Sequence, residues 1–195
     1  MMVTAVGVGV LLTAGCGSDD SPAAEGDRTT TSATTTEAAA APTPEGSAQP
    51  EIVTVGQAVE NGGLTVTVTS VETSPAVAVA DGSGGYVDRT ASDGSQYVLL
   101  AADVVNGMVA PIDLSCGETI GTRLVDAQKQ QFNVIADLGS VQGNRPCGDL
   151  LAPGTDGEVR WVFEVGADSV PKAFAFLNAD APDPTAVKVV NLSVS

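Results

Sequence analysis

The chain has 195 residues, of which 43% are hydrophobic and only 4% aromatic, and it contains no histidine. Its formal net charge of −16 argues against nucleic-acid binding, because phosphate recognition needs clustered Lys and Arg side chains. The same acidity argues against a basic face that would bind anionic lipid. The length and apolar content suffice for one domain with an aliphatic core, which we expect over residues 51–195.

An apolar run over residues 6–12 is followed by small residues and Cys16, and then by polar residues. The run is shorter than the roughly 20 residues needed to span a bilayer, and its pattern is typical of a lipoprotein signal peptide. We therefore expect a signal peptide over residues 1–15 and lipid, such as palmitate, on Cys16. Bacterial lipoproteins, by resemblance, carry several acyl chains, which durable anchoring requires. The alternative is an apolar N-terminus with a chance cysteine.

Residues 16–50 hold threonine triplets, an alanine run and four prolines, and they include no large apolar side chain. Such a segment buries too little surface to offset the entropy of ordering it. We expect a disordered tether that holds the domain off the membrane. Together with Cys16, it predicts a location on the extracytoplasmic face of the bacterial cell membrane.

The pattern changes after residue 50. Residues 52–55 are rich in β-branched side chains, and Asn61-Gly62-Gly63 marks a turn. Residues 64–69 alternate apolar and threonine side chains, which indicates a half-buried strand. Residues 97–105 are almost continuously apolar, which is typical of a central strand.

Further strands are expected over residues 119–125 and 131–135, with a turn at 126–130 between them. A Pro-Gly-containing turn at 153–157 introduces an alternating segment, whose core-facing side chains we expect to be Val159, Trp161, Phe163 and Val165. The last strands are expected over residues 172–177 and 186–194. Short strands with regular turns, and no sustained helical period, predict an all-β, antiparallel β-sandwich.

Two cysteines remain once Cys16 is assigned to lipid. Outside the cytoplasm, Cys116 and Cys147 predict a disulfide bond that closes a loop of about 30 residues. The alternative is a metal site or a pair of reactive thiols. Zinc normally takes four nitrogen or sulfur ligands, and two cysteines without histidine are too few for it.

Several segments fall in the order found in one bacterial family: residues 56–72, 97–106, 124–126, and 151–154 leading to 161–165. In this combination the chain resembles the bacterial lipoproteins of domain of unknown function 4352. Secreted mycobacterial antigens with immunoglobulin-like sandwiches are also similar. The resemblance implies an immunoglobulin-like fold and an extracytoplasmic location, and it brings no reaction and no catalytic residues.

We find no motif for catalysis or for a cofactor. The absence of histidine excludes Ser-His-Asp and Cys-His machinery, and no phosphate loop or dinucleotide fingerprint is present. No motif ties two carboxylates together as glycoside hydrolysis would require. We therefore expect a protein that is not an enzyme and has no cofactor.

A polar, glycine-rich segment over residues 81–95 is the strongest candidate contact loop, since loops on rigid scaffolds commonly carry recognition. Its candidate residues are Asp81, Tyr86, Asp88 and Asp93, and residues 139–148 form a second candidate loop. We expect a membrane-anchored binding module for a protein or cell-envelope component. The alternative is a carrier for a small ligand or for Ca²⁺, which the oxygen-rich side chains would hold.

Overall fold

The computed structural model describes residues 53–183 and 186–193, all of which belong to one compact unit. The predicted signal peptide, Cys16 and the tether lie outside the described residues. The described part is built of β-strands and one short 3₁₀ helix, η1 (Leu138–Ser140). The all-β class, predicted from alternating apolar side chains and regular turns, is therefore confirmed.

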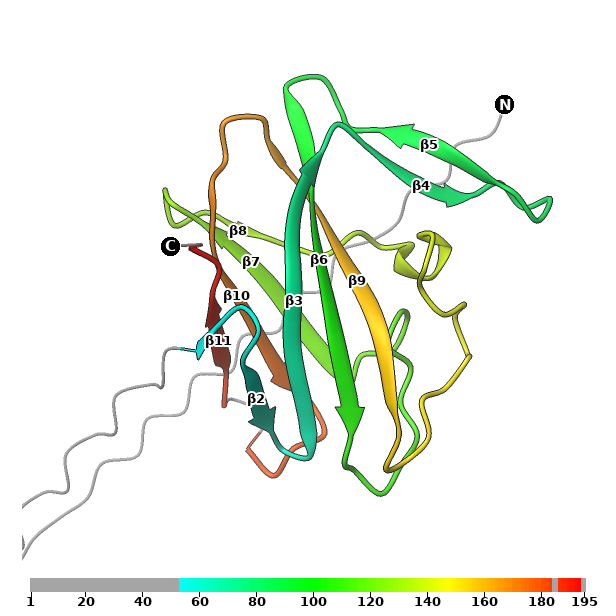
Figure 1. Cartoon of the computed structure of the whole chain (residues 1–195), viewed down its shortest axis with the longest axis vertical. Helices are drawn as coiled ribbons and strands as arrows, with labels where there is room; N and C mark the ends of the chain where they lie inside the picture. Colours follow the sequence, from blue (N-terminus) through cyan, green and yellow to red (C-terminus); the bar gives the residue numbers. More distant parts are fainter. Residues whose placement is uncertain (1–52, 184–185, 194–195) are drawn as a thin grey trace, which may run out of the picture. The chain divides into compact units, whose positions relative to one another are not determined.

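One sheet has four strands in the order β2-β3-β6-β9, all antiparallel to their neighbours. They are β2 (Ala58–Asn61), β3 (Leu64–Ser74), β6 (Ser95–Asn106) and β9 (Asp156–Gly166). The predicted central strand is confirmed, because β6 lies between β3 and β9 along most of its length (Figure 1). Its continuous apolar run follows from this position, since both of its faces are covered over part of the strand.

The other sheet has five strands in the order β1-β11-β10-β7-β8. They are β1 (Val53–Thr54), β7 (Ile120–Asp126), β8 (Gln131–Phe132), β10 (Pro171–Asn178) and β11 (Lys188–Asn191). Only β1 runs parallel to its neighbour, β11. β7 and β10 lie close to the predicted ranges, whereas β1, β8 and β11 are shorter than the predicted 52–55, 131–135 and 186–194.

The connections between the two sheets give the sandwich an immunoglobulin-like order. The chain passes from β6 in the four-stranded sheet to β7 and β8 in the other, returns to β9, and passes again to β10 and β11. The β6–β9 pair and the β8-β7-β10-β11 group thus take the places of the B–E pair and the C′-C-F-G group of an immunoglobulin domain. The antiparallel β-sandwich predicted from the sequence is confirmed.

Alternating side chains of both sheets fill the space between them. The predicted core residues of β9 are at most 2% exposed, as are the alternating apolar residues of β3. Trp161 stacks on Phe174 with 4.8 Å between ring centroids, and Phe163 and Phe176 contact Phe174 from two sides. Four packed aromatic rings leave little room for a ligand between the sheets.

Val162 alternates with the predicted core residues and so lies on the other face of β9, yet its side chain is fully buried. The connection from β8 to β9 covers this outer face of the four-stranded sheet. In that connection, Ile135 donates to the Val162 carbonyl at 2.9 Å, and Leu138 of η1 is buried in the same cluster. Alternation along a strand cannot show that a distant segment folds over its outward face.

The prediction that residues 81–95 form a loop is wrong for residues 86–90. This segment contains β5 (Tyr86–Thr90), which pairs in antiparallel register with β4 (Ala76–Ala80) to form a hairpin. The two buried valines of β4, Val77 and Val79, alternate with alanine and face the sandwich. Alternation followed by a glycine-rich turn is a hairpin signal that the polar composition of the turn obscures.

The end of the sandwich after β6 depends on one buried side chain, Asn106. Its Nδ2 donates to the carbonyls of Ala110 and Leu151 at 2.9 and 3.0 Å, and its Oδ1 accepts from the Met108 N–H at 3.0 Å. Asn106 is fully buried, and its bond to the Leu151 carbonyl is out of contact with bulk water. One side chain therefore holds the β6–β7 loop against the end of the β8–β9 connection.

We predict that Asn106→Ala lowers the free energy of unfolding by about 2–4 kcal/mol, because it removes three hydrogen bonds that a fully buried side chain makes to the backbone. Urea denaturation followed by Trp161 fluorescence measures this change. Asn133→Ala is the matched control, since Asn133 is exposed, and it should change stability by less than about 0.5 kcal/mol. Equal losses in both variants would contradict a special role for Asn106.

Candidate functional site

The β4–β5 hairpin follows β3 and precedes β6 in the sequence, and it projects from the four-stranded sheet (Figure 1). Asp81 shapes its tip, because its Oδ1 accepts hydrogen bonds from the N–H groups of Ser83 and Gly85 at 2.8 and 3.0 Å. The bond from Ser83 is the largest cause that holds the pKa of Asp81 below its usual value. Gly82 and Gly84 have φ near +77° and +94°, which glycine adopts without strain. Asp81 is therefore part of the turn itself.

The second predicted contact loop, residues 139–148, lies against β4 of the hairpin. The backbone of Val79 forms an antiparallel bridge with Val141, and Gln142 donates to the Ala78 carbonyl at 2.9 Å. Val79 and Val141 are both nearly fully buried. The hairpin is thus held along its β4 side by the segment that follows η1.

An ion pair links β5 to η1. Arg89 Nη1 donates to Asp137 Oδ2 at 2.6 Å, and Ser140 Oγ donates to the same oxygen at 3.1 Å. The hydrogen bond from Arg89 is the main cause that lowers the pKa of Asp137, and the pair raises the pKa of Arg89. Within the described residues, Nε and Nη2 of Arg89 are buried without a hydrogen-bond partner. The guanidinium is therefore fixed through Nη1, while Nε and Nη2 lie out of contact with solvent.

A further contact attaches the end of the hairpin to β9. The Ser92 N–H donates to Glu164 Oε1 at 2.7 Å, and bonding to Ser92 is the main cause that lowers the pKa of Glu164. Tyr97 lies on the outer face of β6 by alternation, yet it is only 3% exposed. Arg89 and Tyr97 are close enough to interact electrostatically. The hairpin therefore packs on the outer face of the sheet as a fixed structure.

The hairpin leaves large apolar side chains in solvent. Tyr86 and Val87 are each 52% exposed, and Asp88 beside them is exposed as well. Two adjacent, half-exposed apolar side chains on a rigid strand are typical of a contact surface. Tyr86 thus has the exposure that its predicted role needs, and Val87 is a candidate that the sequence analysis missed.

The candidate acidic residues are not gathered into one site. Asp81 lies at the hairpin tip, Asp88 on β5, and Asp93 in the exposed turn that leads to β6. Within residues 53–183 and 186–193, no three His, Cys, Asp or Glu side chains are grouped as metal ligands. The structure therefore does not bring the proposed calcium ligands together.

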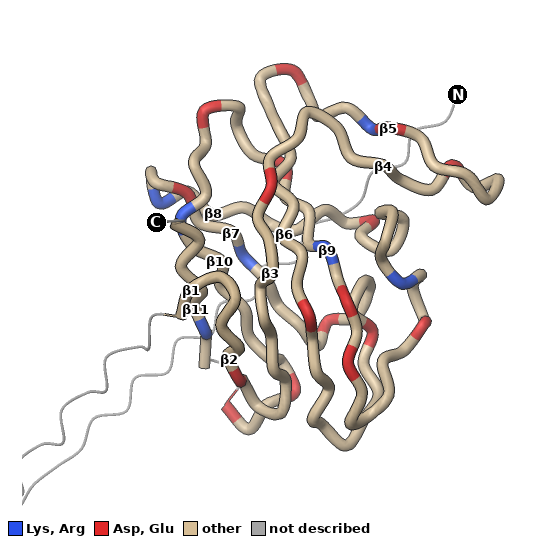
Figure 2. The backbone as a smooth tube through the Cα atoms, viewed as in Figure 1, with Lys and Arg blue, Asp and Glu red and all other residues tan. Residues whose placement is uncertain are grey.

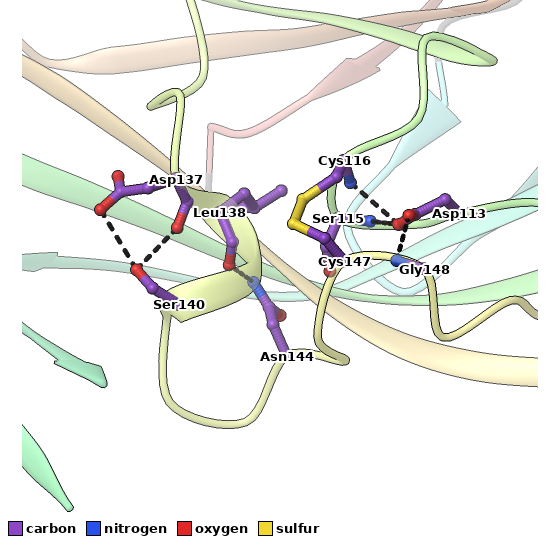
Figure 3. The surroundings of a disulfide bond; sticks show 9 residues. All are labelled: Asp113, Ser115, Cys116, Asp137, Leu138, Ser140, Asn144, Cys147 and Gly148. Carbon is purple, nitrogen blue, oxygen red and sulfur yellow. Dashed lines mark hydrogen bonds between the residues drawn. A yellow bond between two sulfur atoms is a disulfide. The ribbon is translucent and has the colours of Figure 1, made fainter. Parts of the chain in front are cut away.

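The disulfide between Cys116 and Cys147 joins the β6–β7 loop to the β8–β9 connection, as predicted (Figure 3). The two Cα atoms are 5.3 Å apart, and 31 residues separate the cysteines in sequence. A Cβ atom on Gly139 of η1 would lie 2.8 Å from the Cys147 sulfur and 3.1 Å from the Cys116 sulfur. The disulfide and η1 are therefore packed directly against each other.

Asp113 ties the two disulfide segments together through the backbone. Its Oδ1 accepts from the N–H groups of Ser115 and Cys116, both at 2.9 Å, and its Oδ2 accepts from Gly148 at 2.7 Å (Figure 3). Partial burial opposes ionisation of this carboxyl, but the three donors outweigh it and lower its pKa. Sequence reasoning missed Asp113, because an isolated aspartate in a loop carries no signal.

The two sheets differ in charge. The strands of the four-stranded sheet carry Arg160 and six acidic residues, namely Glu60, Glu72, Asp103, Asp156, Glu158 and Glu164. The strands of the five-stranded sheet carry Arg123, Lys172 and Lys188 with one buried acid, Asp126. Figure 2 shows the acidic positions along β3, β6 and β9. The hairpin therefore lies on the acidic side of the sandwich.

A groove of about 390 Å³ lies at the end of the sandwich opposite the hairpin along β6, and it is open to solvent. It lies between the β2–β3 turn and the β6–β7 loop, where Met108 and Pro111 line it and Val109 is 99% exposed. Its lining is mostly apolar and includes one carboxylate, Asp180. We find no set of polar groups converging there that would fix the orientation of a small ligand.

Comparison with known proteins gives a fold and no family. No protein-family model matches the chain, and no curated protein matches it. Among solved structures, an uncharacterized β-sandwich protein from Clostridium difficile 630 is similar, with a TM-score of 0.51 and 16% identity over 74% of this chain and 95% of that chain. This similarity supports the β-sandwich fold alone.

Two further solved structures cover most of the domain at lower similarity. The secreted protein MPT63 from Mycobacterium tuberculosis has a TM-score of 0.49 and 15% identity over 74% of this chain and 99% of that chain. The yjhA protein from Bacillus subtilis has a TM-score of 0.49 and 14% identity over 73% of this chain and all of that chain, 100%. The resemblance to domain of unknown function 4352 stays a prediction.

The residues that the structure describes include no helix of the length and apolar character needed to cross a membrane.

We predict that replacing both Cys116 and Cys147 with serine lowers the free energy of unfolding by about 3–4 kcal/mol, from the loop-closure entropy of the unfolded chain. Because η1 packs on the disulfide, amide hydrogens of β4 and β5 should also exchange faster in this variant. Hydrogen exchange read by mass spectrometry measures this, with β3 peptides as the internal control. Unchanged exchange in the hairpin would contradict the connection between disulfide and hairpin.

We predict a pH-dependent loss of stability in Asp113→Asn. The folded pKa of Asp113 lies below its ordinary value of 3.8, so the ionised carboxylate stabilises the folded chain at pH values above 3.8. That stabilisation is lost as the pH falls through the folded pKa. The difference in unfolding free energy between the two proteins should therefore be constant from pH 7 to about pH 5 and shrink at lower pH. A difference that grows on acidification, in urea titrations at several pH values, would contradict it.

Proposed function

We propose that this chain is a membrane-anchored extracytoplasmic lipoprotein that acts as a binding module. Its β-sandwich presents the β4–β5 hairpin to a protein or to a component of the cell envelope. The signal pattern that ends at Cys16 and the tether over residues 16–50 support the location. Binding requires no catalytic group or cofactor.

One observation carries the proposed role of the hairpin. Tyr86 and Val87 are held half-exposed on a hairpin that four separate contacts fix to the sandwich. A contact surface that is rigid before binding loses little conformational entropy on association. A tyrosine is also among the residue types that contribute most to protein interfaces.

Photocrosslinking in the native cell tests this function. A benzoyl-phenylalanine replaces Tyr86 in the full-length chain, and we expect one discrete crosslinked species that exceeds background by at least about tenfold. The same amino acid at Val109 is the matched control, because Val109 is 99% exposed and follows the opposite end of β6. Crosslinking at Val109 and not at Tyr86 would place the contact elsewhere.

Cys16→Ala provides the control for location. This variant should lose incorporation of an alkyne fatty acid, leave the membrane fraction and lose the Tyr86 crosslink. A chain with Cys16 intact that takes up no fatty acid would contradict the lipid anchor. A crosslink that persists in soluble Cys16→Ala protein would show that the contact does not depend on anchoring.

A further inference from the structure

We infer that β5 binds an extended segment of a partner protein as an additional strand of the hairpin. This inference rests on the proposed function and names the kind of partner that the hairpin takes. Addition of a strand to an exposed sheet edge supplies affinity through main-chain hydrogen bonds and specificity through alternate side chains. Three properties of β5 carry the inference: its free backbone groups, the state of the other edges, and its charge.

The register of the hairpin shows which backbone groups of β5 are free. Asp81 donates to the Gly85 carbonyl at 3.0 Å, and Ala91 donates to the Pro75 carbonyl at 2.9 Å. Because ladder bonds in antiparallel pairs alternate, Val87 and Arg89 bond to β4, and the N–H and C=O groups of Tyr86, Asp88 and Thr90 point away from it. Within the described residues, β5 has no strand neighbour besides β4, and no other backbone group bonds to these three.

The outermost strands of the two main sheets are short or partly covered. At the edges of the five-stranded sheet, β1 and β8 have two residues each. At one edge of the four-stranded sheet, β2 has four residues and pairs with β3 as far as Thr67. The outer edge of β9 is occupied near its middle, where Asn144 bonds to both the N–H and the carbonyl of Arg160, and Ile135 bonds to the Val162 carbonyl. Proteins commonly protect strand edges in these ways. The edge of β5, with five residues, has no such cover.

A second copy of this chain fits the edge poorly. A two-fold pairing that uses the outward groups of Tyr86, Asp88 and Thr90 on both copies places Asp88 directly opposite Asp88. Like charges directly opposite one another destabilise a strand pair. The net charge of −16 adds repulsion between copies.

The chemistry of β5 indicates the partner segment instead. Asp88 and the net charge of −16 favour a Lys or Arg opposite Asp88. On the same face, Tyr86 and Thr90 favour β-branched or aromatic side chains at the flanking positions, and Val87 adds apolar surface on the other face. The geometry thus assigns an extended, basic and apolar segment of another protein as the occupant.

One substitution separates strand addition from side-chain contact. Asp88→Pro removes the outward N–H of Asp88 and leaves the ladder with β4 intact, because proline is tolerated at an edge where its missing N–H faces solvent. Asp88→Ala is the matched control, since it removes the same carboxylate and keeps the N–H. Thr90→Pro tests a second outward N–H in the same way and serves if Asp88→Pro lowers the thermal midpoint of the domain.

The probe is a blocked pentapeptide with a central lysine, flanked on each side by valine and then threonine. NMR titration of the unsubstituted chain should shift the amides of Tyr86, Asp88 and Thr90 saturably and protect them from solvent exchange. Asp88→Pro should weaken binding at least about tenfold, whereas Asp88→Ala should weaken it about threefold or less and reduce its salt dependence. Equal affinity in Asp88→Pro and Asp88→Ala, or no saturable shift at these amides, would overturn strand addition.

Crosslinking from position 86 distinguishes a failure of strand addition from a failure of the proposed binding function. Loss of the cellular crosslink in Asp88→Pro, with retention in Asp88→Ala, supports strand addition. A crosslink that survives both prolines overturns strand addition and leaves the hairpin as a binding surface. Absence of any crosslink in the unsubstituted, anchored chain removes both.

Discussion

The disulfide between Cys116 and Cys147 is the constraint on which the β8–β9 connection and the β4–β5 hairpin depend. It fixes a connection that has one 3₁₀ turn and otherwise no regular structure of its own. This connection fulfils the role that a fourth sheet strand plays in an immunoglobulin domain, because it bonds to the outer edge of β9 and buries Val162. Through Asp137 and Val141 it then holds the β4–β5 hairpin. The disulfide is therefore linked to the hairpin through η1 and the residues on either side of it.

Sequence patterns predicted the sandwich because its strands obey the two-residue period of half-buried sheets. Residues 64–69 and 159–165 show this period clearly, and their inward side chains are buried as expected. The pattern failed where a third layer covers a sheet. Val162 and Tyr97 are on outward faces, and their burial depends on segments that are distant in sequence. No local period records such a contact, so both the hairpin and its support were missed.

The sequence predicted that residues 81–95 lie at the surface, but it did not predict that most of them belong to a hairpin. The polar composition of residues 81–95 indicated a surface segment, and the exposure of Tyr86 agrees with that. Asp81 and three glycines of this segment belong to a five-residue tip between two strands, where Asp81 accepts hydrogen bonds that close the turn. Their oxygen-rich composition is what suggested a calcium site from the sequence. Arg89 and Asp137 are 48 residues apart, and only the folded chain brings them together.

The arrangement of edges relates stability to recognition. An exposed strand edge exposes a protein to unspecific pairing, and the outermost strands of the two main sheets are short or partly covered. The hairpin departs from that rule, because the five-residue edge of β5 has no such cover, and this edge carries Asp88. Negative charge in this position disfavours pairing with a second copy and favours a basic strand. Because Asp88 favours a basic residue opposite it, the open edge of β5 is selective. Because β5 is already fixed to the sandwich, little conformational entropy is lost when a partner binds.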